Sequence, residues 1–146
     1  MSTEEPSPVT VQQRAGHRPA LNELLEAERA GARVAMETAR GMPPGVLTTL
    51  VEDIHRDEVR WCSMLMRSIK ALEGSSSSAT GAFWGKAMAI VDVDQRLSFL
   101  NRGQAWVVRR LEALIPRVPD AQVRADLGQM LEAHRTNIER VDARHG

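Results

Sequence analysis

Four side chains of the types that bind transition metals fall on the apolar faces of predicted helices. They are Glu28, His55, Glu58 and His134. Carboxylate oxygens and imidazole nitrogens are ligands of iron and manganese. A polar side chain on an apolar helix face also needs a partner inside the protein. These residues are therefore either ligands of a metal ion in the interior of a helical domain or polar groups that satisfy one another there.

Glu28 and Glu58 are expected to face each other. Each lies about 15 residues from the turn at Pro43, so folding the chain back at this turn brings them to the same height. Two carboxylates that meet in a core repel each other, and a proton, an arginine or a metal ion must share the space. Glu28 has a second interpretation, in which it pairs with an arginine or faces water at the edge of its helix face.

The second predicted helix contains two overlapping patterns of Glu and His. Glu52 and His55 form a literal Glu-x-x-His, which places two ligands on one helix face in four-helix carboxylate proteins. His55 and Glu58 form the same pair in reverse order. The phase of the apolar positions favours His55 and Glu58 as the inward pair and places Glu52 near the edge.

The last two long helices supply amides and a histidine. Asn101 and Gln104 take the positions where a two-metal site requires a glutamate. Amides are weak oxygen ligands, and the pattern favours hydrogen bonding within the core as their role. Glu132 comes only two residues before His134 and is turned away from it. His134 is therefore either a hydrogen-bonded core residue or a ligand, with Asn101 and Gln104 at its level.

The helices that must position these side chains are predicted by apolar residues that recur at spacings of three and four. Residues 1–18 predict a disordered tail, because they are polar and lack a repeating apolar face. Helices are expected over residues 19–40, 46–72, 82–91, 95–115 and 121–141. The fold class is therefore all-α, with a four-helix bundle over residues 19–142.

The lengths of the connections indicate the topology. The first two helices are joined by about five residues, and so are the last two, so each pair predicts an antiparallel hairpin. About 20 residues lie between the hairpins, whereas the second helix is about 40 Å long at 1.5 Å per residue. A connector that includes a short helix can span this length. The pattern predicts two hairpins joined by one long crossover, which is the ferritin-like connectivity.

The composition excludes several classes of function. Lys plus Arg and Asp plus Glu both number 19, so the chain lacks the net basic charge that favours nucleic-acid binding. Cys62 is the only cysteine, which excludes an internal disulfide and a thiolate zinc cluster. The acidic start has no apolar signal segment, and no apolar run approaches the roughly 20 residues of a membrane span. We expect a cytoplasmic protein without membrane or nucleic-acid partners.

Three segments carry a resemblance to a known superfamily. LNELLEAERAGA (residues 21–32) resembles the first helix of the rubrerythrin and bacterioferritin branch of ferritin-like proteins. DEVRWCSML (57–65) and FLNRGQAWVVR (99–109) resemble a small bacterial family of uncharacterised ferritin-like proteins. The resemblance covers residues 20–142 and implies the fold. In characterised relatives the bundle holds a di-iron centre for iron oxidation, peroxide reduction or oxygen activation. This sequence departs from that pattern in its third and fourth long helices, and Trp61 stands where a histidine is expected after Glu58.

Two hypotheses for the function follow. In the first, a ferritin-like protein binds one or two iron or manganese ions through Glu28, His55, Glu58 and His134, with Asn101, Gln104 and Glu52 around them. In the second, a metal-free bundle acts as a structural or interaction module. Arg102, Arg109 and Arg110 with Trp106 then offer a partner surface, and a homodimer is the expected assembly. Any reaction is left open.

Overall fold

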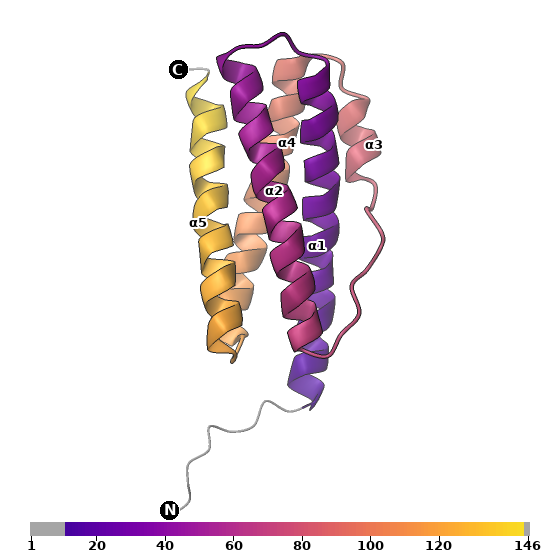
Figure 1. Cartoon of the computed structure of the whole chain (residues 1–146), viewed down its shortest axis with the longest axis vertical. Coiled ribbons are helices and arrows are strands. Elements are labelled where there is room, and N and C mark those ends of the chain that lie inside the picture. The colour runs from indigo at the N-terminus through magenta and orange to yellow at the C-terminus, as the bar shows by residue number, and fades with distance from the viewer. Residues whose placement is uncertain (1–10, 145–146) are drawn as a thin grey trace, which may run out of the picture.

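The computed structural model describes the backbone of residues 11–144 and the side chains of residues 17–144 (Figure 1). The described chain is all-helical, as predicted. Its elements are α1 (Val11–Arg40), α2 (Val46–Ala71), α3 (Phe83–Met88), α4 (Val93–Leu114), the short 3-10 helix η1 (Ile115–Arg117) and α5 (Ala121–Ala143). None of the described helices is both long and apolar enough to cross a membrane.

The four long helices lie side by side, and the short α3 packs outside them (Figure 1). α1 contacts α2 and α4, and α5 contacts the same two helices. The segment after α2 runs back along α1 to α3, so that α4 begins at the end of the molecule where α2 also begins (Figure 1). Each long helix therefore contacts two antiparallel neighbours, and side chains from all four meet in the interior.

The first helix begins earlier than the sequence predicts. Residues 1–10 of the predicted tail lie outside the described residues, but α1 already begins at Val11 and contains Pro19. A proline inside a helix removes one hydrogen bond and crowds the preceding turn, but it does not always end the helix. Tertiary contacts stabilise this turn. Arg18 Nε donates to the Leu72 carbonyl at 2.7 Å, and Ala20 packs against the core.

The starts of α4 and α5 follow local capping. The predicted break around Asp92 becomes the start of α4, because the Asp92 carboxylate accepts a hydrogen bond from the Gln95 amide at 2.9 Å. Asp120 caps α5 in the same way through the Val123 amide at 3.0 Å. An aspartate in this position satisfies a helix N–H that otherwise has no partner.

The connector between α2 and α3 is held against α1. The Asn22 side chain accepts from the Ser77 amide at 2.7 Å, and the Ser77 hydroxyl donates to Glu26 at 2.7 Å. Arg29 donates to the Ala79 carbonyl at 2.8 Å. These bonds fix a non-helical segment over one side of the helices, where it forms part of a cavity described below.

The apolar core is divided into two clusters with a polar layer between them. One cluster lies toward the start of α1 and the end of α2, and its fully buried members include Leu21, Leu65, Leu111 and Leu127. The other lies toward the opposite end and includes Val34, Val51, Ile54, Leu97 and Val141. The buried polar residues at the intermediate height are Glu28, Glu58, Asn101, Gln104, His134 and Asn137. Burial of polar groups in mid-core is costly unless they are paired, so this layer is the first place to look for function.

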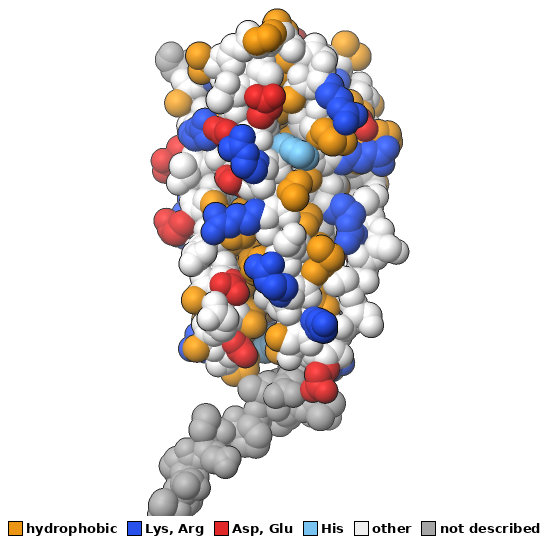
Figure 2. Space-filling view, viewed as in Figure 1, with side chains coloured by type: hydrophobic (Ala, Val, Ile, Leu, Met, Phe, Trp, Pro, Cys, Tyr) orange, Lys and Arg blue, Asp and Glu red, His pale blue; other side chains and the backbone are white. Residues whose placement is uncertain are grey.

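The outer face made by α1, α2 and α5 carries mixed charges. Figure 2 shows basic side chains down the middle of this face, acidic side chains mainly along one side of it, and apolar side chains among them. Such a surface agrees with the formal net charge of zero.

Candidate functional site

The polar layer takes one or more side chains from each long helix. Glu28 comes from α1, Glu58 from α2, Gln104 from α4 and His134 from α5, and their exposed fractions are only 1–3%. Asn101 of α4 is also buried. The predicted inward placement of these five side chains is confirmed.

His134 is fixed by two contacts. Its Nδ1 lies 2.9 Å from the Met130 carbonyl oxygen, which can only accept, so Nδ1 carries a proton. Its Nε2 forms an ion pair with Glu28 Oε1 at 2.7 Å, and neither atom has another hydrogen-bond partner. Burial lowers the pKa of His134, but the charge and contact of Glu28, the Met130 carbonyl and the charge of Asp57 together raise it above 6.5. This rise favours an imidazolium paired with the Glu28 carboxylate.

Glu58 lies against the backbone of α1 at Gly31. A Cβ at position 31 would overlap Glu58 Oε2, so the glycine makes room for the carboxyl group. Oε2 is buried without a hydrogen-bond partner. Burial, then the charges of Glu28 and Asp57, raise the pKa of Glu58 well above 4.5. Without a metal ion, Glu58 therefore keeps its proton to a higher pH than an exposed glutamate.

The two amides of α4 differ in their bonding. Asn101 Nδ2 donates to Asp142 Oδ1 at 2.9 Å and to the Ile138 carbonyl at 3.3 Å, which ties α4 to α5. Gln104 is only 3% exposed, yet neither its amide oxygen nor its amide nitrogen has a hydrogen-bond partner. The predicted structural hydrogen bonding thus applies to Asn101, whereas Gln104 offers both of its polar atoms to something else.

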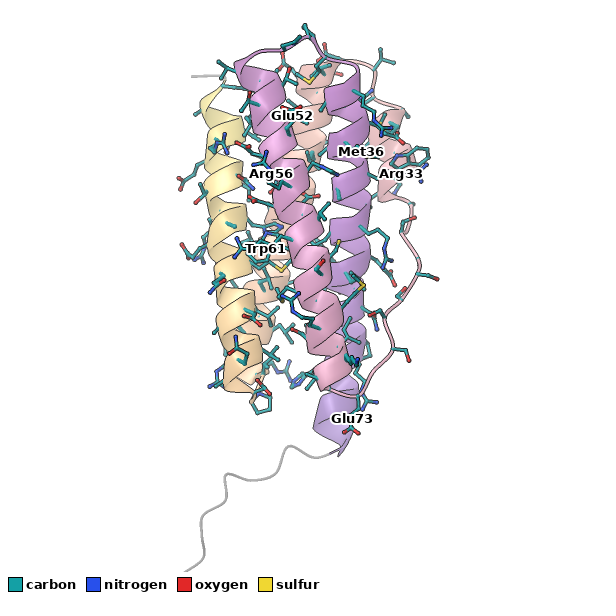
Figure 3. All side chains as sticks on the ribbon, in the orientation of Figure 1. Arg33, Met36, Glu52, Arg56, Trp61 and Glu73 are labelled. Atoms are coloured by element: carbon teal, nitrogen blue, oxygen red, sulfur yellow. The ribbon has the colours of Figure 1, made fainter. Side chains whose placement is uncertain are left out.

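His55 does not join the layer, and its predicted inward placement was wrong. It is only half-buried and lines a shallow groove on the outer side of α1 and α2 with Met36 and Glu52. Figure 3 shows Met36 and Glu52 on that outer side. The centre of the buried face of α2 runs through Ile54 and Glu58, which turns His55 to the edge.

A second polar pair adjoins the layer and was not predicted. Asn137 Nδ2, 4% exposed, donates to Asp57 Oδ2 at 3.0 Å and so links α5 to α2. Asn137 lies three residues after His134, on the same helix face, which is the signal that identifies it. Trp61 is buried as well and points from α2 towards α5 (Figure 3).

A cavity of about 470 Å³ opens onto the layer between α1, α4 and the connector. Its floor contains Glu28, Glu58 and Gln104. Its walls are largely apolar and aromatic, and charged side chains stand at its rim. The walls and rim include Ala27, Phe83, Phe99, Leu100, Trp106, Val107, Glu23, Glu26, Arg102 and Arg109. The cavity gives small molecules a route to the buried carboxyl groups.

One family model matches the chain, over residues 18–143, and it is described as a domain of unknown function (DUF6306). The chain belongs to this family. The comparisons with curated proteins and with solved structures gave no match. The matched residues include every side chain of the polar layer, so the layer and its cavity are parts of the DUF6306 domain.

The donor set of this domain does not fit a two-metal centre. Such a centre in a helical bundle takes four carboxylates and two imidazoles, whereas the layer holds two carboxylates and one imidazole. As they lie, no three His, Cys, Asp or Glu side chains among residues 17–144 are grouped to hold a metal ion. Atoms of the types that could bind one metal ion are nevertheless present. Glu58 Oε2 and Gln104 Oε1 are buried without a hydrogen-bond partner, and Glu28 Oε1 and His134 Nε2 are buried with only each other as a partner, at 2.7 Å.

Cys62, beside this layer, is expected to be unreactive. Burial and then the charges of Glu28 and Glu58, partly offset by Arg29, raise the pKa of its thiol from 9.0 to about 12. Because the thiolate is the nucleophile, we expect alkylation by iodoacetamide at pH 8 to be roughly a thousandfold slower in the folded domain than in urea. Mass spectrometry of timed samples measures both rates. Similar rates in the two states would show that the thiol is not perturbed in this way.

Proposed function

We propose that this domain is a ferritin-like protein that binds one divalent metal ion, iron or manganese, in its polar layer. Glu28, Glu58 and His134 are the proposed ligands, and the Gln104 amide oxygen is the proposed fourth donor. Two helical hairpins joined by a connector that runs the length of the helices support the ferritin-like assignment.

The observation that carries the proposal is a group of buried metal-binding atoms with too few polar partners. Most buried polar groups in proteins have a hydrogen-bond partner, so each exception needs a reason. Here Glu58 Oε2 and Gln104 Oε1 lack one, and at the same height Glu28 Oε1 and His134 Nε2 have only each other, at 2.7 Å. A divalent cation satisfies such donors together and offsets the repulsion between Glu28 and Glu58.

Binding requires movement of side chains. Because no three acidic or imidazole groups are grouped around one point among the described residues, at least one donor must turn for an ion to be held. Glu58 has room to do so, since its carboxyl group borders the cavity. Bound iron with an open position would supply redox chemistry with oxygen or peroxide. The domain itself contributes an aromatic-walled approach to the layer.

Metal content tests this proposal. The protein is purified aerobically from cells supplied with iron or manganese, and metal per chain is measured. We expect about one ion in the unmodified protein and a loss of most of it in Glu28→Ala and Glu58→Gln. Glu52→Gln is the matched control, because this exposed residue belongs to the same helix as Glu58. A content near zero that Glu28→Ala does not change would refute the proposal.

The alternative is a metal-free domain that acts by association. Of the four side chains predicted to form a partner surface, Arg102, Trp106 and Arg109 line the cavity. The fourth, Arg110, stacks over the Trp106 ring at 4.8 Å and lies 3.5 Å from Glu23. Three of the four side chains thus line a cavity of the size of small-molecule sites, which favours a small ligand over a protein partner. The homodimer stays a prediction, and light scattering over a range of concentrations measures it.

A further inference from the structure

We propose that the cavity between α1, α4 and the connector binds a planar aromatic molecule that carries an acidic group. The walls and the rim of the cavity, which take no part in the proposed metal site, carry most of the argument, and Gln104 is shared between the two sites. The cavity volume of about 470 Å³ lies within the range of small-molecule sites.

The walls provide flat apolar surfaces. The rings of Phe83 and Phe99 are stacked, with centroids 5.0 Å apart and planes 15° from parallel. Gly103 allows this arrangement, because a Cβ there would lie 2.8 Å from the Phe83 ring. Trp106 and Leu100 complete the aromatic and aliphatic lining. Aromatic side chains stack favourably with other ring systems, so a planar molecule is the best match for these walls.

The floor of the cavity provides one side-chain amide that can both donate and accept a hydrogen bond. Gln104 is 3% exposed, lines the cavity, and has no partner for either its amide N–H or its carbonyl oxygen. Burial of an unpartnered amide costs free energy in the empty site. A ligand edge that offers a donor and an acceptor removes this cost. Gln104 therefore favours a ring system with polar atoms on its inner edge.

The rim provides positive charge. Arg102 lies over the Phe99 ring at 5.4 Å, and Arg109 stands nearby on α4. Among the described side chains, no carboxylate is within ion-pair distance of either guanidinium. The rim carboxylates are engaged elsewhere, Glu23 near Arg110 and Glu26 with Ser77. An acidic group on the outer end of the ligand would pair with the two arginines.

Two fluorescent probes test the site in metal-stripped protein. 1-Anilinonaphthalene-8-sulfonate has a planar ring system and an acidic group, and N-phenyl-1-naphthylamine has the same rings without the sulfonate. We expect saturable binding of the sulfonate at one molecule per chain. The double variant Arg102→Met/Arg109→Met should weaken sulfonate binding roughly tenfold and leave the neutral probe within about twofold. Arg67→Met, an exposed change on α2, is the control.

A filled cavity provides the second arm of the test. Ala27→Phe places a ring in the cavity from α1 and should abolish saturable binding of both probes, with circular dichroism confirming the helical content. The proposal is overturned if neither probe binds saturably, if Ala27→Phe leaves folded protein that still binds, or if the arginine variant weakens both probes equally. Because the protein is stripped of metal, none of these outcomes depends on the metal site.

Discussion

His134→Leu lowers the free energy of unfolding at pH 7 by about 3–5 kcal/mol, the cost expected when one partner of a buried charge pair is removed. Glu28 is 2% exposed, and His134 Nε2 is its closest charged neighbour, at 2.7 Å. Without the imidazole, the carboxylate must either stay charged in the core or take up a proton. Urea unfolding of metal-stripped protein, followed by circular dichroism, measures the loss.

The double variant Glu28→Leu/His134→Leu distinguishes this cause from lost packing. It removes both charges, and we expect it to recover most of the stability, because apolar groups often replace a buried pair at little cost. His55→Leu is the control on a half-buried histidine and should change stability by under about 0.5 kcal/mol. Additive losses in the double variant, or a loss in His134→Leu no larger than in His55→Leu, would contradict the assigned pairing.

Glu58→Gln makes the metal-stripped domain more stable at neutral and alkaline pH, and the gain increases with pH. The folded state raises the pKa of Glu58, so it holds a proton that the unfolded chain has released above about 4.5. The stability that this proton contributes is present below 4.5 and is lost as pH rises toward the folded pKa, at about 1.4 kcal/mol per pH unit. Glutamine has nearly the same shape and no charge, so the variant lacks this loss.

Unfolding curves collected between pH 4 and 9 on both proteins give the difference directly. His134 adds a slope of the same sign, because its raised pKa makes stability fall as pH rises above 6.5. That slope is common to both proteins and cancels in the comparison. Glu52→Gln, an exposed change on the same helix, should follow the unmodified protein at every pH. Parallel curves for Glu58→Gln and the unmodified protein would show that Glu58 is not held in its protonated form.

The polar layer was largely predictable, because helix periodicity decides which residues face inward. Glu28 and Glu58 each continue an apolar spacing of three and four, and equal distance from the turn puts them at one height. The same rule failed for His55, because one residue along a helix turns the side chain by about 100°, from the centre of a face to its edge. Burial at Ile54 and Trp61 shows where the centre of the α2 face lies.

Features that depend on contacts between distant segments were not predictable from periodicity. α1 continues through Pro19, and next to this proline Arg18 bonds the Leu72 carbonyl at the far end of α2, a contact that periodicity does not predict. The Asp57 and Asn137 pair requires α2 and α5 to be neighbours. The cavity depends on a connector without regular structure, whose position is fixed by hydrogen bonds to α1.

The number of metal ions bound per chain tests the central proposal most directly. Metal-stripped protein is dialysed to equilibrium under anaerobic conditions against iron(II) or manganese(II), and bound metal is measured as the free concentration is raised. We expect binding to saturate at one ion per chain, and Glu58→Gln to abolish it. Saturation at two ions would indicate a two-metal centre, for which the layer lacks ligands. No saturable binding would leave the layer as a metal-free ion pair beside a protonated glutamate and would contradict the proposal.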